Sequence, residues 1–171
     1  AGFNASNAVL KRGVGIGCMW YGIGNTALSN PSSMRIGLAR NGTVTFYNGC
    51  ADIGQGTNTT MLQVVADAVG LPVDRIRYVA GDTDLTLDAG KSSASRQAFV
   101  SGKASELAGM DLRARLLSLV SAKEPARIHI EGWRLHVEDA SGHQSVDLTT
   151  LPPNERGNVV ARTDPLGRTT L

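Results

Sequence analysis

A tight turn at Asn41-Gly42 is the feature that most constrains how this chain can fold. Apolar side chains occupy alternate positions in residues 34–38, before the turn, and again in residues 44–46, after it. Alternation with a period of two is typical of a β-strand. Asn-Gly is the pair favoured by two-residue hairpin turns, because both central positions take a positive φ. The sequence therefore predicts a β-hairpin here.

Two helical patterns follow the hairpin. Apolar residues recur at helical spacing in residues 61–68, and Gly70 with the proline beyond it ends that pattern. Residues 75–80 are typical of a short strand. A longer helical pattern runs through residues 100–120, and the glycines inside it predict either two helices or one kinked helix.

The last third of the chain contains a second candidate hairpin. Its alternating runs, residues 127–131 and 133–138, meet at Gly132. Residues 151–171 carry prolines and no amphipathic period, so we expect a truncated loop there. Alternating hairpins and helices predict an α+β fold, with a mixed or antiparallel sheet and two to three helices. We expect residues 1–171 to form a single partial domain.

Near the N-terminus, the glycines at positions 13, 15 and 17 alternate with apolar residues. This arrangement predicts a strand with one bare face, against which another part of the protein packs closely.

Composition excludes several classes of partner. The 171 residues are 42% hydrophobic and carry a formal charge of only +2, so we expect a folded chain with no field that attracts nucleic acid or an acidic membrane. No apolar stretch reaches membrane-spanning length, and the N-terminus shows no targeting leader. Cys18 and Cys50 lack neighbours at metal-ligand spacing, which favours buried thiols and a reducing cytoplasm.

Both helical patterns are preceded by segments that can present backbone amides to a ligand. Residues 53–57, Ile-Gly-Gln-Gly-Thr, precede the first, and residues 90–96, Gly-Lys-Ser-Ser-Ala-Ser-Arg, precede the second. A helix N-terminus has unpaired N–H groups and a partial positive charge, and glycine lets a ligand approach the backbone. Both segments are candidate anion-binding sites, and we call them the cradle segments. Gln55 adds a side-chain amide that can donate and accept, and Arg96 adds a guanidinium, a charged fork of N–H donors.

A simpler interpretation stays open for each segment. Gly54 and Gly56 can serve only to permit a tight turn, Ser92 or Ser93 can be a helix N-cap, and Arg96 can be solvated. Neither segment matches a Walker loop or a dinucleotide-binding fingerprint. The histidines in the second hairpin favour a solvated face over a catalytic base.

The order of these motifs is more specific than any one of them. Arg12-Gly13, Asn41-Gly42, residues 51–56, residues 92–96 and residues 101–104 follow one another as they do in the xanthine dehydrogenase/aldehyde oxidase family. The match runs from about Lys11 to Ala104. The chain resembles the second half of the molybdopterin-binding subunit of that family.

The resemblance implies a molybdenum cofactor held by a pyranopterin dithiolene, either as molybdopterin itself or extended to molybdopterin cytosine dinucleotide. Such enzymes hydroxylate an aldehyde or an N-heterocycle such as a purine, using oxygen derived from water. Electrons then pass through iron-sulfur clusters to FAD on partner domains or subunits. The remainder of the molybdopterin subunit would be a further partner.

The resemblance also implies which residues contact the cofactor. It places Thr26 on the substrate side and the Ala94 backbone nearest the metal. The expected cofactor contacts are Gly54, Gln55, Gly56, Ser92, Ser93, Ala94, Ser95 and Arg96.

Two motifs of that family are absent from these 171 residues. The general-base glutamate belongs to a Gly-Glu segment nearer the C-terminus, and the glycine-rich Phe loop belongs to the preceding half of the subunit. We therefore expect the isolated chain to be inactive. The alternatives are a non-catalytic interaction domain that keeps the fold, and an unrelated phosphate- or nucleotide-binding module.

Overall fold

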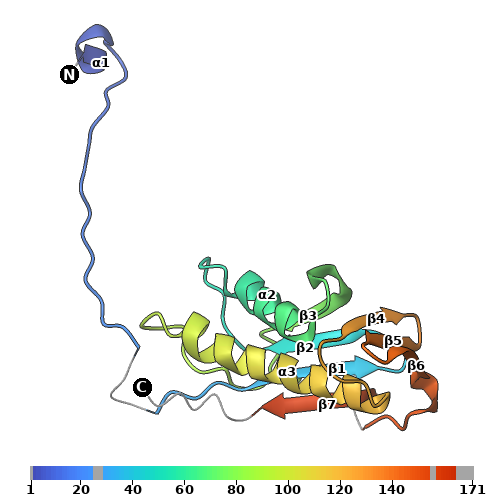
Figure 1. The fold of residues 1–171 in the computed structure, drawn as a ribbon. Helices are drawn as coiled ribbons and strands as arrows, with labels where there is room; N and C mark the ends of the chain where they lie inside the picture. Colours follow the sequence, from blue (N-terminus) through green and yellow to red (C-terminus); the bar gives the residue numbers. More distant parts are fainter. Residues whose placement is uncertain (1, 25–28, 155–156, 165–171) are drawn as a thin grey trace.

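A computed structural model describes residues 2–24, 29–154 and 157–164 of the chain. Within these residues, a four-stranded sheet of order β3-β2-β1-β7 carries the long helices α2 and α3 on one face (Figure 1), and a three-stranded sheet of order β4-β5-β6 follows α3. The helices are α1 (Gly2–Ser6), α2 (Thr57–Val69) and α3 (Gly102–Leu119), with short helical turns η1 (Val73–Arg75), η2 (Gln97–Ser101) and η3 (Leu148–Thr150). The strands are β1 (Met34–Ala39), β2 (Val44–Asn48), β3 (Ile76–Ala80), β4 (Arg127–Glu131), β5 (Arg134–Asp139), β6 (Gly142–Asp147) and β7 (Asn158–Asp164).

The predicted hairpin at Asn41-Gly42 forms, but its turn is not the expected two-residue type. Ala39 and Thr43 are still hydrogen-bonded to each other, so residues 40–42 form the loop, and Asn41 does not take a positive φ. β1 and β2 pair antiparallel, with Ile36 opposite Phe46, and Gly42 takes a φ of 80° at the turn. The Asn41 side chain accepts a hydrogen bond from the Thr43 amide at 3.1 Å. β3 joins this hairpin in parallel, after the crossover helix α2, so the sheet is mixed. The predicted α+β class is confirmed.

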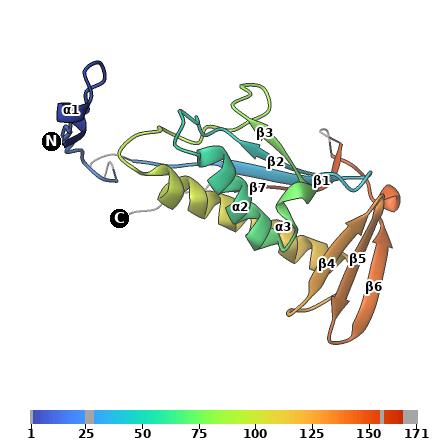
Figure 2. The ribbon, with the colours of Figure 1, turned by 90° about the horizontal axis from the view of Figure 1, so that it is seen from above.

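Both predicted long helices are present, and they lie side by side (Figure 2). Gly70 ends α2 in the left-handed conformation, at a φ of 82°. The second helix is continuous: it begins with the π-helical turn η2 and continues as α3. Gly109 does not break it. A Cβ at position 109 would lie 2.7 Å from the Ala68 Cβ on α2, so this glycine is required for close packing between the helices.

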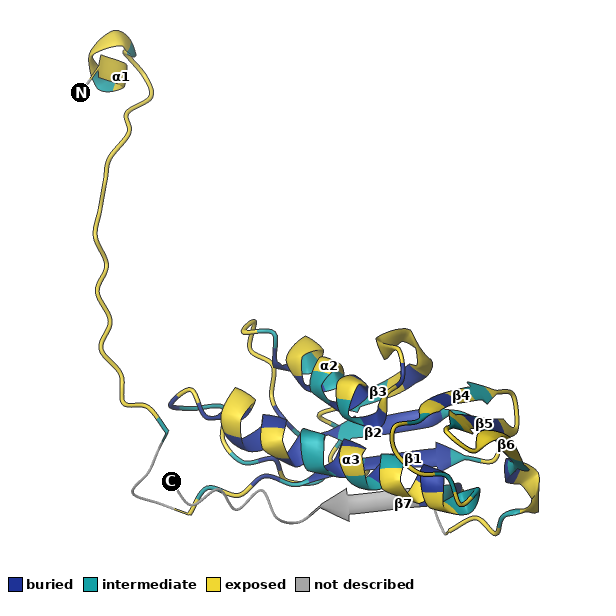
Figure 3. Cartoon of the chain, viewed as in Figure 1, coloured by how far each residue is buried: buried dark blue, intermediate teal, exposed yellow. Residues whose placement is uncertain are grey.

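The core lies between the larger sheet and the helices, whose inward faces are buried (Figure 3). Phe46 and Leu38 from the sheet are fully buried, as are Val65 of α2 and Leu112 of α3. The core continues to Leu135 of the smaller sheet. Burial of this apolar surface is the main force that holds the helices on the sheet.

The smaller sheet confirms the second hairpin and adds a strand that the sequence did not predict. β4 and β5 pair antiparallel around Gly132, with His129 opposite His136. β6, of sequence GHQSVD, extends the sheet from β5. Its polar, half-exposed side chains lack a clear alternation, which is why its pattern was missed.

The expected loop over residues 151–171 is wrong for residues 158–164. This segment is β7, which pairs antiparallel with β1 so that Ile36 lies opposite Arg162. The pairing joins segments far apart in the sequence, and long-range pairing of this kind leaves little local signal. Residues 165–171 lie outside the described part of the chain.

The glycine-alternating N-terminal segment is extended, but among the described residues it has no ladder partner, so the predicted strand is not formed. We call residues 7–24 the N-terminal arm. It projects away from the sheets (Figures 1 and 3). Gly13, Gly15 and Gly17 have no neighbour within 4 Å of an added Cβ, and the side chain of Val14 is 100% exposed.

Candidate functional site

The two candidate cradle segments lie together in one groove. Gln55 lines it from the first segment and residues 92–96 line it from the second, with Met19 and Tyr21 of the arm completing the wall. Its volume is about 580 Å³, within the range typical of small-molecule sites. Gly54 and Gly56 flank Gln55 but do not line the groove.

The first segment is a turn held by a carboxylate. Asp52 accepts hydrogen bonds from the amides of Gly54 (2.9 Å), Gly56 (3.3 Å) and Asn58 (3.0 Å). These bonds, that from Asn58 foremost, lower the pKa of Asp52 below its ordinary value of 3.8. The Asp52 carboxylate thus already accepts hydrogen bonds from the Gly54 and Gly56 amides, which were expected to face an anionic ligand. This role of Asp52 was not predicted from the sequence.

Gln55 also closes this turn. Its Oε1 accepts a hydrogen bond from the Ile53 amide at 2.7 Å, and its Nε2 donates to the Ala51 carbonyl at 3.0 Å. The Gln55 side chain is exposed and lines the groove, so it is both a brace for the turn and part of the groove wall.

The second segment has an unusual backbone. Ala94 and Ser95 take φ values of 52° and 54°, which residues other than glycine seldom adopt. Strained backbone of this kind clusters at ligand sites. The arm contacts this segment: the Gly24 amide donates to the Ala94 carbonyl at 2.7 Å, and the hydroxyls of Tyr21 and Ser93 are 3.0 Å apart.

Arg96 is neither a free charged fork nor solvated, because its side chain is only 1% exposed. The guanidinium donates to the carbonyls of Ala89 and Lys91 at 2.9 Å, and to those of Pro31 (2.8 Å) and Asn30 (3.2 Å). Burial lowers its pKa from the ordinary value of 12.5. Its Nε is buried and, within the described residues, has no hydrogen-bond partner.

Several other sequence expectations have a definite outcome. Ser92 and Ser93 are not N-caps, because the helical region starts at Gln97 without a capping side chain. His129 and His136 pair on the exposed face of the smaller sheet, and His136 Nδ1 lies 3.1 Å from His143 Nε2. No group of three metal-binding side chains gathers in the described chain. Thr26 lies outside the described residues.

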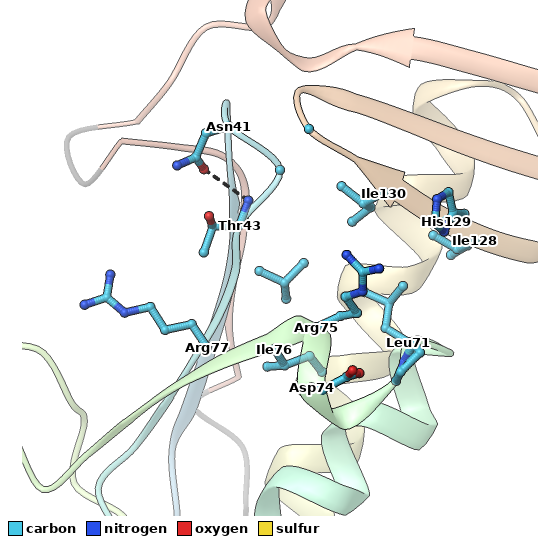
Figure 4. A pocket seen from close by; sticks show the side chains of 14 residues that line it. Asn41, Thr43, Leu71, Asp74, Arg75, Ile76, Arg77, Ile128, His129 and Ile130 are labelled. Carbon is cyan, nitrogen blue, oxygen red and sulfur yellow. Dashed lines mark hydrogen bonds between the residues drawn. The ribbon is translucent and has the colours of Figure 1, made fainter.

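A second cavity, of about 470 Å³, lies between the β1–β2 turn, η1 and β4 (Figure 4). Arg75 and Ile130 face each other across it, and Asp74 lies at its edge. Neither cradle segment contributes to it, and no sequence motif indicated this cavity.

Comparison with known proteins establishes the family. Residues 1–162 match the family model described as "Molybdopterin cofactor-binding domain", so the chain belongs to that family. It is similar to the xanthine dehydrogenase molybdenum-binding subunit of Escherichia coli O157:H7, with 35% identity over 115 residues, covering 64% of this chain and 15% of that protein.

Solved structures share this fold. The Cu,Mo-CO dehydrogenase in its carbon monoxide reduced state matches with a TM-score of 0.58 and 21% identity, over 84% of this chain and 20% of that one. Quinoline 2-oxidoreductase from Pseudomonas putida 86 matches with a TM-score of 0.54 and 26% identity, over 77% and 18% of the two chains. The chain thus corresponds to a small part of each, and the resemblance predicted from the motifs is confirmed.

Proposed function

We propose that the groove forms one wall of the molybdopterin site in a molybdenum hydroxylase, an oxidoreductase that hydroxylates an aldehyde or an N-heterocycle such as a purine. The observation that carries this proposal is the convergence of Gln55 and residues 92–96, from distant parts of the chain, on one groove of suitable size. Neither an interaction domain without cofactor nor a nucleotide-binding module is favoured by an observation of this kind.

The residues of the groove fit such a cofactor. Met19, Tyr21 and Ile53 offer exposed apolar surface to a pterin ring, and the hydroxyls of Ser93 and Ser95 offer polar contacts. The buried Arg96 Nε is a donor without a partner among the described residues, beside the groove. When bound, the cofactor supplies the molybdenum at which oxygen and electrons are transferred.

In this proposal the chain's own residues bind and orient the cofactor. Gln55 fixes the first wall, and the strained backbone at Ala94 and Ser95 shapes the second. Arg96 ties the second wall to residues 30–31 through its carbonyl bonds. Gly54 and Gly56 act indirectly, because their left-handed backbone lets the turn close around Asp52.

The remaining features of the enzyme are proposed from family membership. We propose a molybdopterin, either unmodified or in the cytosine dinucleotide form, with FAD and iron-sulfur clusters on partner domains or subunits and a cytoplasmic location. The rest of the molybdopterin subunit would supply the general base and Thr26 would face the substrate. Within the described residues, no helix is both long and apolar enough to cross a bilayer.

The role of Gln55 is tested by Gln55→Ala in the gene product purified from its native cell. We expect a lower molybdenum content per polypeptide, because the turn loses both hydrogen bonds that shape the first wall. Elemental analysis and the melting temperature would be measured together, so that loss of cofactor is separated from loss of fold.

Gln63→Ala is the matched control. Gln63 is exposed on α2 and does not line the groove, so this variant should keep its molybdenum. Equal molybdenum content in both variants and the parent protein would remove the role assigned to Gln55.

A further inference from the structure

Gln97 lines the groove next to residues 92–96 and is almost fully buried, at 7% exposed. Its Oε1 accepts hydrogen bonds from the Cys50 thiol at 3.1 Å and from the Ser101 hydroxyl. The π-helical turn η2 places Gln97 and Ser101 where their side chains meet. Turns of this type are rare and occur frequently at functional sites.

The other end of the Gln97 amide reaches the groove. Nε2 donates to the Ser92 hydroxyl at 3.1 Å, and that hydroxyl donates to the Ala51 carbonyl at 2.8 Å. The same carbonyl accepts the hydrogen bond from Gln55. We call Gln97, Ser92 and the Ala51 carbonyl the bridge, because they join the two walls of the groove through one continuous path.

Each hydrogen bond of the bridge has a defined donor and a defined acceptor. Cys50 and Ser101 both donate to Oε1, which turns the Nε2 of Gln97 toward Ser92. Burial raises the pKa of the Cys50 thiol, so the thiol stays protonated and remains a donor. Since the Ser92 hydroxyl accepts from Gln97, its own hydrogen is directed to Ala51.

We propose that Gln97 is a positioning residue of the molybdopterin groove, which acts through Ser92 to hold residues 51–56 and residues 92–96 at the spacing that the cofactor requires. This inference rests on the proposed function. Both ends of the Gln97 amide are hydrogen-bonded within the chain, and little of the side chain is exposed in the groove. We therefore expect its effect on cofactor retention to depend on the Ser92 hydroxyl.

A double-mutant cycle tests this dependence. Gln97→Met, Ser92→Ala and the double variant would be made in the native gene product, and the rate of molybdenum loss on dilution would be measured for each. The melting temperature of each cofactor-free protein would show the purely structural cost. Gln63→Met, on the exposed face of α2, is the matched control.

We expect each single variant to lose molybdenum about fivefold to tenfold faster than the parent, as the loss of one hydrogen bond implies. The double variant should be no faster than either single variant, because both break the same path. Ser92→Thr keeps the hydroxyl and should restore the parent rate. Should Gln97→Met fail to fold, the contrast between Ser92→Ala and Ser92→Thr still tests the bridge.

Three results would overturn the inference. Gln97→Met could lose molybdenum at the parent rate, the two single effects could multiply in the double variant, or Ser92→Thr could be as fast as Ser92→Ala. Each leaves the proposed function standing, provided that the parent holds molybdenum. A folded parent without molybdenum would remove the proposed function and this inference together.

Discussion

At Asp52, a single carboxylate holds the turn in front of α2 through the amides of Gly54, Gly56 and Asn58. Its pKa is lower in the folded chain than its ordinary value of 3.8, so the folded state binds the proton less readily than the unfolded state. The stabilisation is complete above that ordinary value and is lost as the pH falls through the lower folded value.

Replacing Asp52 with Asn should therefore destabilise the chain most at neutral pH, and the difference from the parent should shrink as the pH falls below 3.8. Urea denaturation of both proteins across this range measures the difference. A difference that is constant with pH would show that the charge of Asp52 does not stabilise the fold.

Individual residues show which parts of the candidate site could be predicted from the sequence. Helix-start chemistry and the family resemblance singled out Gln55 and residues 92–96, and the structure gathers them in one groove. Arg96 was also predicted to present its charge to a ligand, whereas its guanidinium donates hydrogen bonds to backbone carbonyls of the chain. Asp52 and Gln97 were missed because their partners are set by the turn and by tertiary contacts, for which local spacing carries no signal.

At the scale of elements, two glycines in one helix should respond to alanine in opposite ways. A Cβ at Gly109 would lie 2.7 Å from the Ala68 Cβ and 3.1 Å from the Val65 carbonyl oxygen. At Gly102, an added Cβ would approach only the Met61 Cε, at 4.0 Å. The first glycine is required by helix packing, whereas the second has room for a side chain.

We expect Gly109→Ala to lower the free energy of unfolding by about 1–3 kcal/mol through overpacking. Gly102→Ala should raise it by roughly 0.5–1 kcal/mol through better helix propensity. Chemical denaturation of both variants provides the comparison. If both substitutions stabilise the chain, α2 and α3 do not pack as closely as described.

Elements with a local pattern were predicted, and those formed by distant pairing were not. The hairpin at Asn41-Gly42 and the helix ending at Gly70 carry both periodicity and a stop signal. β7 forms by pairing with β1, across more than half of the chain, and the sequence around it is rich in prolines. The glycine-alternating strand was expected, but a strand needs a ladder partner, and the arm has none among the described residues.

At the scale of the whole molecule, the N-terminal arm leaves a large apolar surface uncovered. Val14, Ile16 and Trp20 are 100%, 90% and 95% exposed. Contiguous exposed surface of this kind marks an interaction site, and an extended chain without a ladder partner invites pairing. We therefore expect the 171-residue chain to self-associate as its concentration rises.

Trp20→Ser should reduce this self-association, as measured by sedimentation equilibrium, because it removes the largest apolar side chain of the arm. Trp133→Ser is the matched control: Trp133 is 60% exposed but lies in the turn between β4 and β5. A parent chain that stays monomeric at every concentration, or equal effects of the two variants, would show that the arm is not the associating surface.

This chain is proposed to form part of a molybdopterin site, so its gene product should contain both molybdenum and a pterin. The most direct measurement is the molybdenum and pterin content of the gene product purified, folded, from its native cell, together with its mass. We expect stoichiometric molybdenum and pterin in a polypeptide longer than these 171 residues. A folded product that contains neither molybdenum nor pterin would contradict it.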